Sequence, residues 1–328
     1  MNTIKNKKIL VTGGAGFIGS HIVDVLVREQ PKEIIVFDNL IRGTKENLKD
    51  ALKSKKVKIV KGDITNPSQI NRAMKGIDYV FHQAALWLLT CEKNPREAIR
   101  VNIEGTFNVL EACVKNKVKK IVAASSSSVY GDGIYFPTDE EHPFNNYLFY
   151  GATKVADEQL YRAFWKKFGL DYVAFRYLSV YGPRQDYRSA YISAIMNFIN
   201  KIAVGESPVI KGDGTATMDL IYVGDVAEAN ILALKSDITN ECFNAASGKE
   251  TTVKQLLDIL VDLMEAKDVQ PIYEPRDKKL VSRRYGCPKK AKKMLGFKAK
   301  TSVKEGMRKV IEWWNEEEKS KIKNQKSK

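Results

Sequence analysis

A tyrosine and a lysine four positions apart are the residues of this chain whose types and spacing could do the most chemistry. Tyr150 and Lys154 stand in the run Tyr-Gly-Ala-Thr-Lys, and residues four apart on a helix project from the same face. A lysine ammonium beside a phenol favours the ionised form of the phenol. Because an unperturbed tyrosine has a pKa of about 10, such a positive charge would let Tyr150 act as a general base near neutral pH. A pair at this spacing is common on exposed helices, so its interpretation depends on the other motifs.

A glycine-rich turn near the start of the chain predicts a dinucleotide site. Gly14 to Gly19 have the spacing G-x-G-x-x-G and follow an apolar, strand-like run at 8–12. Such glycines let the backbone approach a pyrophosphate, whose charge the N-terminus of the next helix stabilises. Asp38 ends the second strand-like run, where a carboxylate accepts hydrogen bonds from the ribose hydroxyls of NAD and repels the 2′-phosphate of NADP. We therefore expect NAD as the cofactor, with NADP as the alternative because Arg42 stands nearby.

A cluster of serines precedes the tyrosine. Ser125 to Ser128 follow a strand-like run at 120–125, and in open α/β sheets ligands bind at the carboxyl ends of the strands. A hydroxyl group there can hydrogen-bond a substrate hydroxyl and relay its proton to Tyr150. A polar turn would explain the serines alone, but Tyr150 and Lys154 in the same chain favour the functional interpretation.

These residues need a scaffold, and the alternation of the first half predicts a doubly wound one. Short apolar strands are expected at 8–12, 33–38, 57–62, 79–84, 120–125 and 172–177, and helices at 21–29, 96–116 and 150–168. Repeated βαβ units of this kind predict an α/β fold with a parallel Rossmann sheet covered on both faces. Beyond residue 183 the pattern loosens into helices near 190–203, 226–235, 253–264 and 303–315.

The pattern divides the chain into three parts. We expect an NAD-binding Rossmann domain over residues 1–176 and a smaller, partly interleaved α/β region for substrate binding over 177–315. We also allow for segments of the second region, such as about 220–236, to pack as part of the Rossmann domain. Residues 316–328 are charged and lack apolar periodicity, so we expect a disordered basic tail there.

Composition narrows the function classes. The net charge of +15 comes from lysines spread along all 328 residues, without an aromatic RNA-binding motif, so no nucleic-acid partner is expected. No apolar run approaches the roughly 20 residues of a membrane span, and the start of the chain does not resemble a signal peptide. We therefore expect a cytoplasmic protein that is not bound to a membrane. Neither a metal site nor a disulfide framework is expected, because the cysteines are scattered at Cys91, Cys113, Cys242 and Cys287.

Taken together, the motifs resemble the extended short-chain dehydrogenase/reductase family. Within it they are most similar to the nucleotide-sugar epimerases and dehydratases, and above all to UDP-glucose (galactose) 4-epimerases. The resemblance covers roughly residues 8–315. It rests on the glycine loop, Asp38-Asn39-Leu40, Gly62-Asp63-Ile64, His82-Gln83-Ala84-Ala85, Asn102 and the residues after it to Thr106, the serine cluster, Tyr150 with Lys154, and Arg176-Tyr177.

The resemblance implies roles for individual residues. Ser126 would be the catalytic hydroxyl, Tyr150 the base, and Lys154 the group that binds the nicotinamide ribose and assists Tyr150. The implied NAD-binding residues are Gly13, Gly16, Phe17, Ile18, Gly19, Asp38, Asn39, Asp63, Ile64, Gln83, Ala84, Ala85, Asn102, Tyr150, Lys154 and Tyr177. The expected substrate-binding residues are Ser127, Ser128, Ser179, Arg184, Lys211 and Arg276, with the three cations available to neutralise a diphosphate.

The serine cluster also bears on the reaction. The 4,6-dehydratases that the chain resembles carry Thr-Asp-Glu or Thr-Ser-Glu where this chain has Ser126, Ser127 and Ser128. Without that carboxylate, elimination of water loses an acid-base partner, whereas reversible oxidation at one carbon remains feasible. We therefore expect an NAD-dependent nucleotide-sugar 4-epimerase with a transient 4-keto intermediate. The alternatives are a 4-dehydrogenase or 4-reductase, a 4,6-dehydratase, and more remotely a non-catalytic NAD-binding regulatory protein.

Two positions depart from the UDP-galactose 4-epimerase pattern. Ser179 stands where that family has an Asn, and Met218 stands where it has an Arg, and both family residues contact the nucleotide diphosphate. We favour a UDP-hexose as substrate and keep other nucleotide bases open. The apolar loop around Trp87 either packs under the cofactor or forms a wall for a deoxy or bulky sugar.

The two long predicted helices carry more apolar residues than one face against a sheet needs. The resembled family pairs two such helices across a twofold axis, so we expect a homodimer. The residues concerned are Ile99, Ile103, Leu110, Leu160, Phe164 and Trp165.

Overall fold

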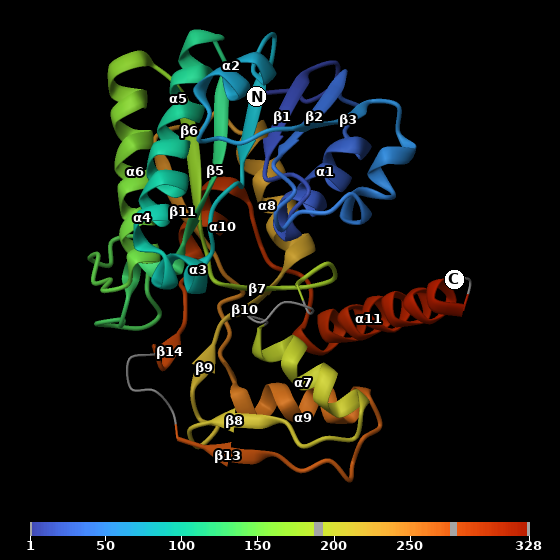
Figure 1. Ribbon diagram of the computed structural model, residues 1–328. Coiled ribbons are helices and arrows are strands. Elements are labelled where there is room, and N and C mark those ends of the chain that lie inside the picture. The colour runs from blue at the N-terminus through green and yellow to red at the C-terminus, as the bar shows by residue number, and fades with distance from the viewer. Residues whose placement is uncertain (1, 187–192, 276–280, 327–328) are drawn as a thin grey trace.

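A parallel sheet of seven strands runs through the centre of the larger part of the molecule (Figure 1). The computed structural model describes residues 2–186, 193–275 and 281–326. The strand order is β11-β6-β5-β4-β1-β2-β3, and all neighbouring strands are parallel. The strands are β1 (Lys8–Thr12), β2 (Glu33–Asp38), β3 (Val57–Lys61), β4 (Tyr79–His82), β5 (Lys120–Ser126), β6 (Asp171–Tyr177) and β11 (Glu241–Ala245). The predicted doubly wound Rossmann sheet is therefore confirmed.

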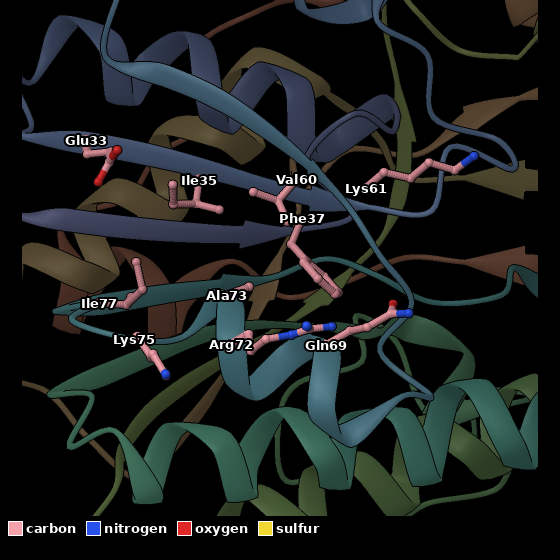
Figure 2. A pocket seen from close by; sticks show the side chains of 10 residues that line it. All are labelled: Glu33, Ile35, Phe37, Val60, Lys61, Gln69, Arg72, Ala73, Lys75 and Ile77. Carbon is pink, nitrogen blue, oxygen red and sulfur yellow. The ribbon is translucent and has the colours of Figure 1, made fainter.

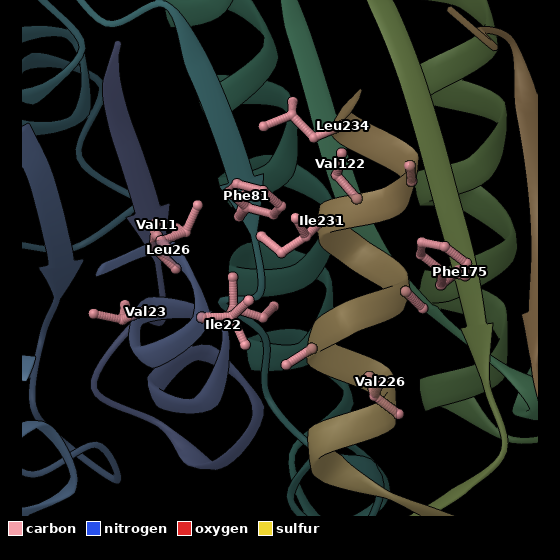
Figure 3. Packing of buried hydrophobic residues seen from close by; sticks show 14 of the residues in the cluster. Val11, Ile22, Val23, Leu26, Phe81, Val122, Phe175, Val226, Ile231 and Leu234 are labelled. Atoms are coloured by element: carbon pink, nitrogen blue, oxygen red, sulfur yellow. The ribbon is translucent and has the colours of Figure 1, made fainter. Parts of the chain in front are cut away.

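Helices cover both faces of this sheet because its strands are apolar on both sides. The helices are α1 (Phe17–Arg28), α2 (Pro67–Ala73), α3 (Leu88–Lys93), α4 (Pro95–Ala98), α5 (Gly105–Lys115), α6 (Phe149–Phe168), α8 (Val223–Lys235) and α10 (Lys289–Leu295). Neighbouring strand residues point to opposite faces. Phe81 and Val122 pack with α1, α8 and α10, whereas Val80 and Ile121 pack with α2, α5 and α6. Figure 3 shows the first of these cores, in which Ile22 of α1 and Ile231 of α8 pack in one cluster with Phe81.

The chain leaves the large sheet after β6 and returns to it through α8, β11 and α10. Helix α8 packs on α1 and on β5, and β11 pairs with β6 at the sheet edge. Both elements come from the part of the sequence beyond residue 177. The two parts of the molecule are therefore interleaved in sequence.

A smaller region with its own core lies beside the carboxyl ends of the strands (Figure 1). Its strands form the pairs β7 with β10 and β8 with β13 and the triple β12-β9-β14. Its core joins Phe198, Leu256, Leu260 and Val310. Its strands and helices are β7 (Ser179–Tyr181), β8 (Val209–Lys211), β9 (Thr217–Met218), β10 (Leu220–Tyr222), β12 (Thr251–Thr252), β13 (Ile272–Glu274), β14 (Arg283–Arg284), α7 (Ala194–Ala203), α9 (Val253–Leu263) and α11 (Val303–Lys326).

The prediction of a disordered tail from residue 316 is wrong, because α11 continues to Lys326. Its first turns are anchored by Met307 and Val310 in the core and by the Trp314 Nε1 donor, 2.9 Å from Asn200 Oδ1. The residues that follow are rich in glutamate and lysine, which have high helix propensity. A helix that is already nucleated extends at little further cost, so it needs no apolar face of its own.

The predicted helix at 96–116 is helical throughout but not uniform. A π-helical turn, η3 (Ile99–Glu104), joins α4 to α5. Asn102 lies within this turn and is fully buried. Turns of this type occur frequently at functional sites. Three 3₁₀ turns complete the larger part, namely η1 (Glu46–Leu48), η2 (Ala51–Lys53) and η4 (Ser127–Tyr130).

Candidate active site

The serine, tyrosine and lysine that the sequence singled out lie together at the carboxyl edge of the sheet. Ser126 ends β5, where its register partner on β6 is Tyr177. The Ser126 Oγ accepts a hydrogen bond from the Ser128 amide at 3.1 Å, which starts the turn η4. Tyr150 lies in the first turn of α6, with Ser126 close enough to its hydroxyl to lower the pKa of the phenol. A hydroxyl pair thus stands at the end of the strand where ligands of such sheets bind.

The phenol of Tyr150 is under opposing influences. Burial raises its pKa above the ordinary value, while the charge of Lys154 and the nearby Ser126 side chain lower it. Burial is the largest of these effects. For Tyr150 to act as a base near neutral pH, further positive charge must therefore reach the site.

Lys154 is held deep under the sheet edge. Its Nζ donates to the Ala124 carbonyl at 3.1 Å and to Asp157 Oδ2 at 3.0 Å. Burial disfavours its ammonium form, but Asp157 and Tyr150 outweigh that effect and raise the pKa of Lys154. Lys154 is therefore a fixed positive charge at neutral pH.

The glycine loop has the shape that a pyrophosphate requires. Gly13 has a φ of +66°, and a Cβ on it would stand 2.7 Å from the Ala84 amide nitrogen, so only glycine fits. A Cβ on Gly19 would stand 2.2 Å from the Gly13 carbonyl oxygen. Gly16 precedes α1, and within the described residues no side chain caps its first turn. The amide donors of that turn are thus directed at the position of an anion.

Asp38 is poised to receive a ribose. Its Oδ2 accepts from the Ala15 amide at 3.0 Å and its Oδ1 from the Leu40 amide at 2.8 Å. Burial raises the pKa of Asp38, while these two hydrogen bonds lower it. A carboxylate has about four lone-pair positions. Acceptor sites on Asp38 therefore remain for the two hydroxyls of an adenosine ribose, and the site fits NAD.

Asn39 and Asp63 meet where β2 and β3 end. Asn39 Nδ2 donates to Asp63 Oδ2 at 3.3 Å, and Asp63 Oδ1 accepts from the Thr65 amide at 2.9 Å. Ile64 is buried against Gly105, whose Cβ would stand 2.7 Å from the Ile64 Cδ1. Phe17, at the start of α1, has its ring edge-on to His21. Ile18, which follows it, is partly buried against the core.

Two predicted cofactor residues are hydrogen-bonded to each other, and a buried amide that the sequence did not single out contacts one of them. The Tyr177 hydroxyl donates to Gln83 Oε1 at 3.1 Å, and Asn230 Nδ2 donates to the Tyr177 hydroxyl at 2.9 Å. Asn230 comes from α8, more than fifty residues beyond Tyr177. The return of α8 to the sheet therefore completes this part of the site.

Asn102 acts through the loop after β4. Its side chain accepts from the Leu86 amide at 2.7 Å and donates to Thr153 Oγ1 at 3.0 Å. The π-helical turn directs this amide at both partners. Asn102 thereby holds the loop with Ala84 and Ala85 against α6, next to Tyr150 and Lys154.

The predicted substrate residues are not all brought together. Ser127 and Ser128 lie on η4 beside Ser126, and Ser179 starts β7. Arg184 forms an ion pair with Asp24 of α1 at 2.7 Å. Lys211 is exposed on β8 and pairs with Glu274, and Arg276 lies outside the described residues.

A buried ionic network supports the serine cluster from below. Glu158 accepts two hydrogen bonds from Arg176, at 2.9 Å and 2.8 Å, and a third from Ser125 Oγ at 2.5 Å. Arg176 Nη1 also donates to the Tyr130 hydroxyl at 3.1 Å. The sequence analysis missed Glu158 as a site residue. Its spacing was a usable signal, because Glu158 follows Lys154 by four residues and so shares its helix face.

Arg42 is engaged by two other loops. Its guanidinium stacks over the Trp87 ring, with 4.7 Å from Cζ to the ring centroid, and Nη2 donates to Asp186 Oδ2 at 3.2 Å. The Trp87 loop therefore packs against a cation near the end of β2. Because its guanidinium is engaged by Trp87 and Asp186, Arg42 is not free to bind the 2′-phosphate of NADP.

A groove of about 370 Å³ lies on another part of the surface (Figure 2). Phe37 and Ile35 of β2 line it together with Arg72 and Lys75. None of its lining residues belongs to the predicted catalytic, cofactor or substrate set. Over the described ranges, no cluster of His, Cys, Asp and Glu could hold a metal ion. In the same ranges, no helix has both the length and the apolar character to cross a membrane.

The fold and the site together define a Rossmann-type dinucleotide-binding enzyme with a serine, a tyrosine and a lysine at its centre. A model of the NAD dependent epimerase/dehydratase family matches residues 9–246. This is more than half of the chain, so the protein belongs to that family. Its cofactor is NAD, and it is an enzyme of the nucleotide-sugar epimerase/dehydratase group.

Known relatives cover nearly the whole chain. A Methanocaldococcus jannaschii protein named "Putative UDP-glucose 4-epimerase" is 40% identical over 310 residues, which are 93% of this chain and 97% of the relative. The solved UDP-N-acetylglucosamine 4-epimerase of Methanobrevibacter ruminantium, in complex with UDP-N-acetylmuramic acid, is 36% identical with a TM-score of 0.90 and covers 95% of this chain and 99% of its own. UDP-glucuronic acid decarboxylase 6 of Arabidopsis thaliana is 30% identical over 313 residues, 92% of this chain and 87% of the relative. The similarity thus extends to enzymes with different reactions.

Proposed function

We propose that this protein is an NAD-dependent nucleotide-sugar 4-epimerase that works through a transient 4-keto sugar. The observation that carries the proposal is the placement of Ser126 and Tyr150 beside the buried ammonium of Lys154 at the sheet edge. The epimerase names among its relatives support the same choice. A UDP-hexose is the favoured substrate class.

The residues divide the proton and charge work between them. Tyr150 takes the proton of the sugar 4-hydroxyl, directly or through Ser126. It returns the proton after the 4-keto sugar has rotated to present its other face. Lys154 stabilises the phenolate form of Tyr150 throughout. NAD held by the glycine loop and Asp38 would supply the hydride acceptor for C4 and the hydride donor for its return to the other face. Because no net redox change results, the cofactor has to stay bound through the cycle. We propose that the close contacts of Gly13 with the loop after β4, and of Asp38 with Ala15, help to keep it bound.

The surroundings of Ser126 favour epimerisation over dehydration. Ser127 and Ser128 follow it without a carboxylate. Glu140, a nearby acid of the following loop, is engaged elsewhere, because its Oε1 accepts from the Asn244 amide at 2.6 Å. Removal of the C5 proton needs a base in contact with it. These residues provide no such group, which favours return of the hydride to the 4-keto sugar over elimination.

Incubation with UDP-glucose or UDP-N-acetylglucosamine in deuterated water tests the proposal. We expect the C4 epimer by NMR, with no deuterium at C5 and no accumulation of reduced nicotinamide. The Tyr150→Phe variant is the control. A 4-keto-6-deoxy product would instead identify a dehydratase, and accumulating reduced nicotinamide a dehydrogenase. Loss of carbon dioxide from UDP-glucuronic acid would identify a decarboxylase.

The nucleotide end of the substrate is the least constrained part of the proposal. Ser179 and Met218 replace residues that bind the diphosphate in the resembled epimerases. Arg184 and Lys211 already form ion pairs with Asp24 and Glu274. We propose that substrate binding exchanges at least one of these ion pairs for the diphosphate. Competition by UDP, TDP and GDP for product formation would identify the base.

We also propose a homodimer formed through α5 and α6. Of the apolar residues expected there, Ile99 is 49% exposed, whereas Leu110 and Phe164 belong to the core. Phe107 and Phe168 are exposed on the same two helices. Light scattering should give about twice the 37.0 kDa of one chain. Ile99→Glu with Phe107→Glu should shift the protein to a monomer, and a monomeric parent protein would contradict the proposal.

A further inference from the structure

Asp157 is an acid in contact with the catalytic lysine and was not part of the expected machinery. It follows Lys154 by three residues on α6, and its Oδ2 lies 3.0 Å from Lys154 Nζ. The two side chains are 3% and 0% exposed. A charge pair this well shielded from water interacts far more strongly than a surface pair. The charge of Asp157 is therefore felt by any group that depends on Lys154.

The Lys154 ammonium interacts with two acidic groups, the Tyr150 phenol and the Asp157 carboxyl, which compete for its charge. On one side its ammonium favours the phenolate of Tyr150, and on the other it is held by the carboxylate of Asp157. A carboxylate near Tyr150 disfavours the phenolate, because both carry negative charge. The ionised Asp157 consequently weakens the help that Lys154 gives to Tyr150, while its hydrogen bond keeps the ammonium in place.

We propose that Asp157 is a positioning residue for Lys154 and that its negative charge sets how readily Tyr150 loses its proton. The inference rests on the proposed function only for the role of Tyr150 as base. In the neutral, protonated form, Asp157 leaves the ammonium of Lys154 unopposed. The tyrosine then ionises more easily.

The pKa values of the groups near Lys154 single out Asp157. Burial raises the pKa of Asp157 to about 6, while Lys154 and Thr106 lower it. Burial lowers the pKa of His82 to about 3 and raises that of Cys91 to about 11, so both are neutral near pH 6. On α6 itself, Tyr161 has a raised pKa, and Glu158 is paired with Arg176. Asp157 is thus the carboxyl group in contact with Lys154, and its pKa lies between those of His82 and Cys91.

The test compares Asp157→Asn with Asp157→Ala. The amide keeps an oxygen acceptor for Lys154 but removes the charge, whereas alanine removes both. Tyr150 ionisation is followed by the ultraviolet absorbance that tyrosine gains on losing its proton, with the same variant carrying Tyr150→Phe subtracted. We expect Asp157→Asn to lower the Tyr150 midpoint by about one pH unit or more. Glu111→Gln, an exposed change on α5, should leave the midpoint unchanged.

Turnover gives the second readout. In Asp157→Asn, the activating limb of the pH profile of kcat/KM should move to lower pH by as much as the Tyr150 midpoint does. NAD should remain bound. In Asp157→Ala the loss of the acceptor should also lower kcat about tenfold, because Lys154 is no longer held in place. The proposal is wrong if Asp157→Asn folds but shifts neither the Tyr150 ionisation midpoint nor the activating limb of kcat/KM by more than about 0.2 pH units.

The unmodified protein offers a test that does not depend on the variants folding. With ¹³C at the ring carbon bearing the Tyr150 hydroxyl, the NMR shift should show an inflection near pH 6 as Asp157 titrates. A flat shift between pH 5 and 7 would overturn the proposal. Neither titration needs a sugar. A normal inflection without any epimer formed would therefore contradict the proposed function and leave the role of Asp157 intact.

Discussion

The ion pairs beneath the serine cluster and those of the smaller region differ sharply in their exposure. The Arg176 and Glu158 side chains are 6% and 4% exposed. In the smaller region, the Lys254 and Asp258 side chains of α9 are 47% and 57% exposed at a separation of 2.5 Å. Both pairs are close in space, but only the first is shielded from water. Contact distance alone therefore says little about what an ion pair contributes.

The difference separates two tasks. At the sheet edge, buried charges hold Ser125, Tyr130 and Lys154 in one arrangement before any ligand arrives. Preorganised charges of this kind are what proton and hydride transfer require. In the smaller region, cations such as Lys211 lie at the surface in exchangeable pairs. Such groups can adapt to the nucleotide and sugar without disturbing the chemistry.

The largest effect is expected from breaking the buried pair. Glu158→Gln leaves the Arg176 charge without its partner, so we expect the free energy of unfolding to fall by about 3–5 kcal/mol. Denaturant titration measures this loss. Glu158→Gln combined with Arg176→Met removes both charges and should recover much of the stability. A loss below about 1 kcal/mol in the single variant would remove the contrast between the two regions.

The next effect concerns the proposed base. Tyr150→Phe should lower turnover at least about 100-fold, equivalent to about 2.7 kcal/mol, because it removes the proton acceptor. NAD should remain bound, since the glycine loop and Asp38 are unchanged. Turnover with the sugar nucleotide and the NAD content of the purified protein measure the two outcomes. Turnover at the parent rate would show that Tyr150 is not the base.

A smaller effect is expected at the cofactor ribose. Asp38→Ala should weaken NAD binding about tenfold or more and affect NADP far less, because the carboxylate repels the extra phosphate. Asp38→Asn removes the charge but keeps one acceptor oxygen, for either the Ala15 or the Leu40 amide, so it loses fewer loop contacts than Asp38→Ala. Calorimetric titration with both cofactors measures the preference. An unchanged preference in both variants would remove Asp38 from the cofactor site.

The smallest effect is expected at the surface of the smaller region. Lys254→Ala breaks the exposed pair with Asp258 and should change the free energy of unfolding by less than about 0.5 kcal/mol. The denaturation experiment used for Glu158→Gln serves here too. A loss comparable to that of the buried pair would mean that this region is as tightly organised as the sheet edge.

Local patterns in the sequence were sufficient for much of the fold. The strands at 8–12 and 33–38 were predicted with the bounds that the structure has, because an apolar run bounded by glycine, asparagine or charge has few alternatives inside a covered sheet. Strand order at the carboxyl edge then brings Ser126 close to Tyr150. The helix that was expected from residue 21 begins at Phe17, so the last three residues of the glycine motif already belong to it.

Other features depended on contacts between distant segments. The sequence could not indicate that Asn230 of α8 would reach Tyr177, or that Arg184 would pair with Asp24, because hydrogen bonds and ion pairs across the chain leave no local periodicity. The helix through Lys326 was missed for a related reason. Its apolar anchor lies in its first turns, and the charged remainder looks like a solvated tail when it is considered alone.

The sequence by itself determined which residues could do chemistry, because residue type and spacing decide which side chains share a helix face or a strand end. Only the tertiary structure decided their electrostatic state. Whether Lys154 faces solvent or Asp157, and whether Tyr150 is shielded from water, depends on how α6 packs against β5 and the π-helical turn. Burial and charge act through distances in space, and these distances arise when segments far apart in the sequence pack together.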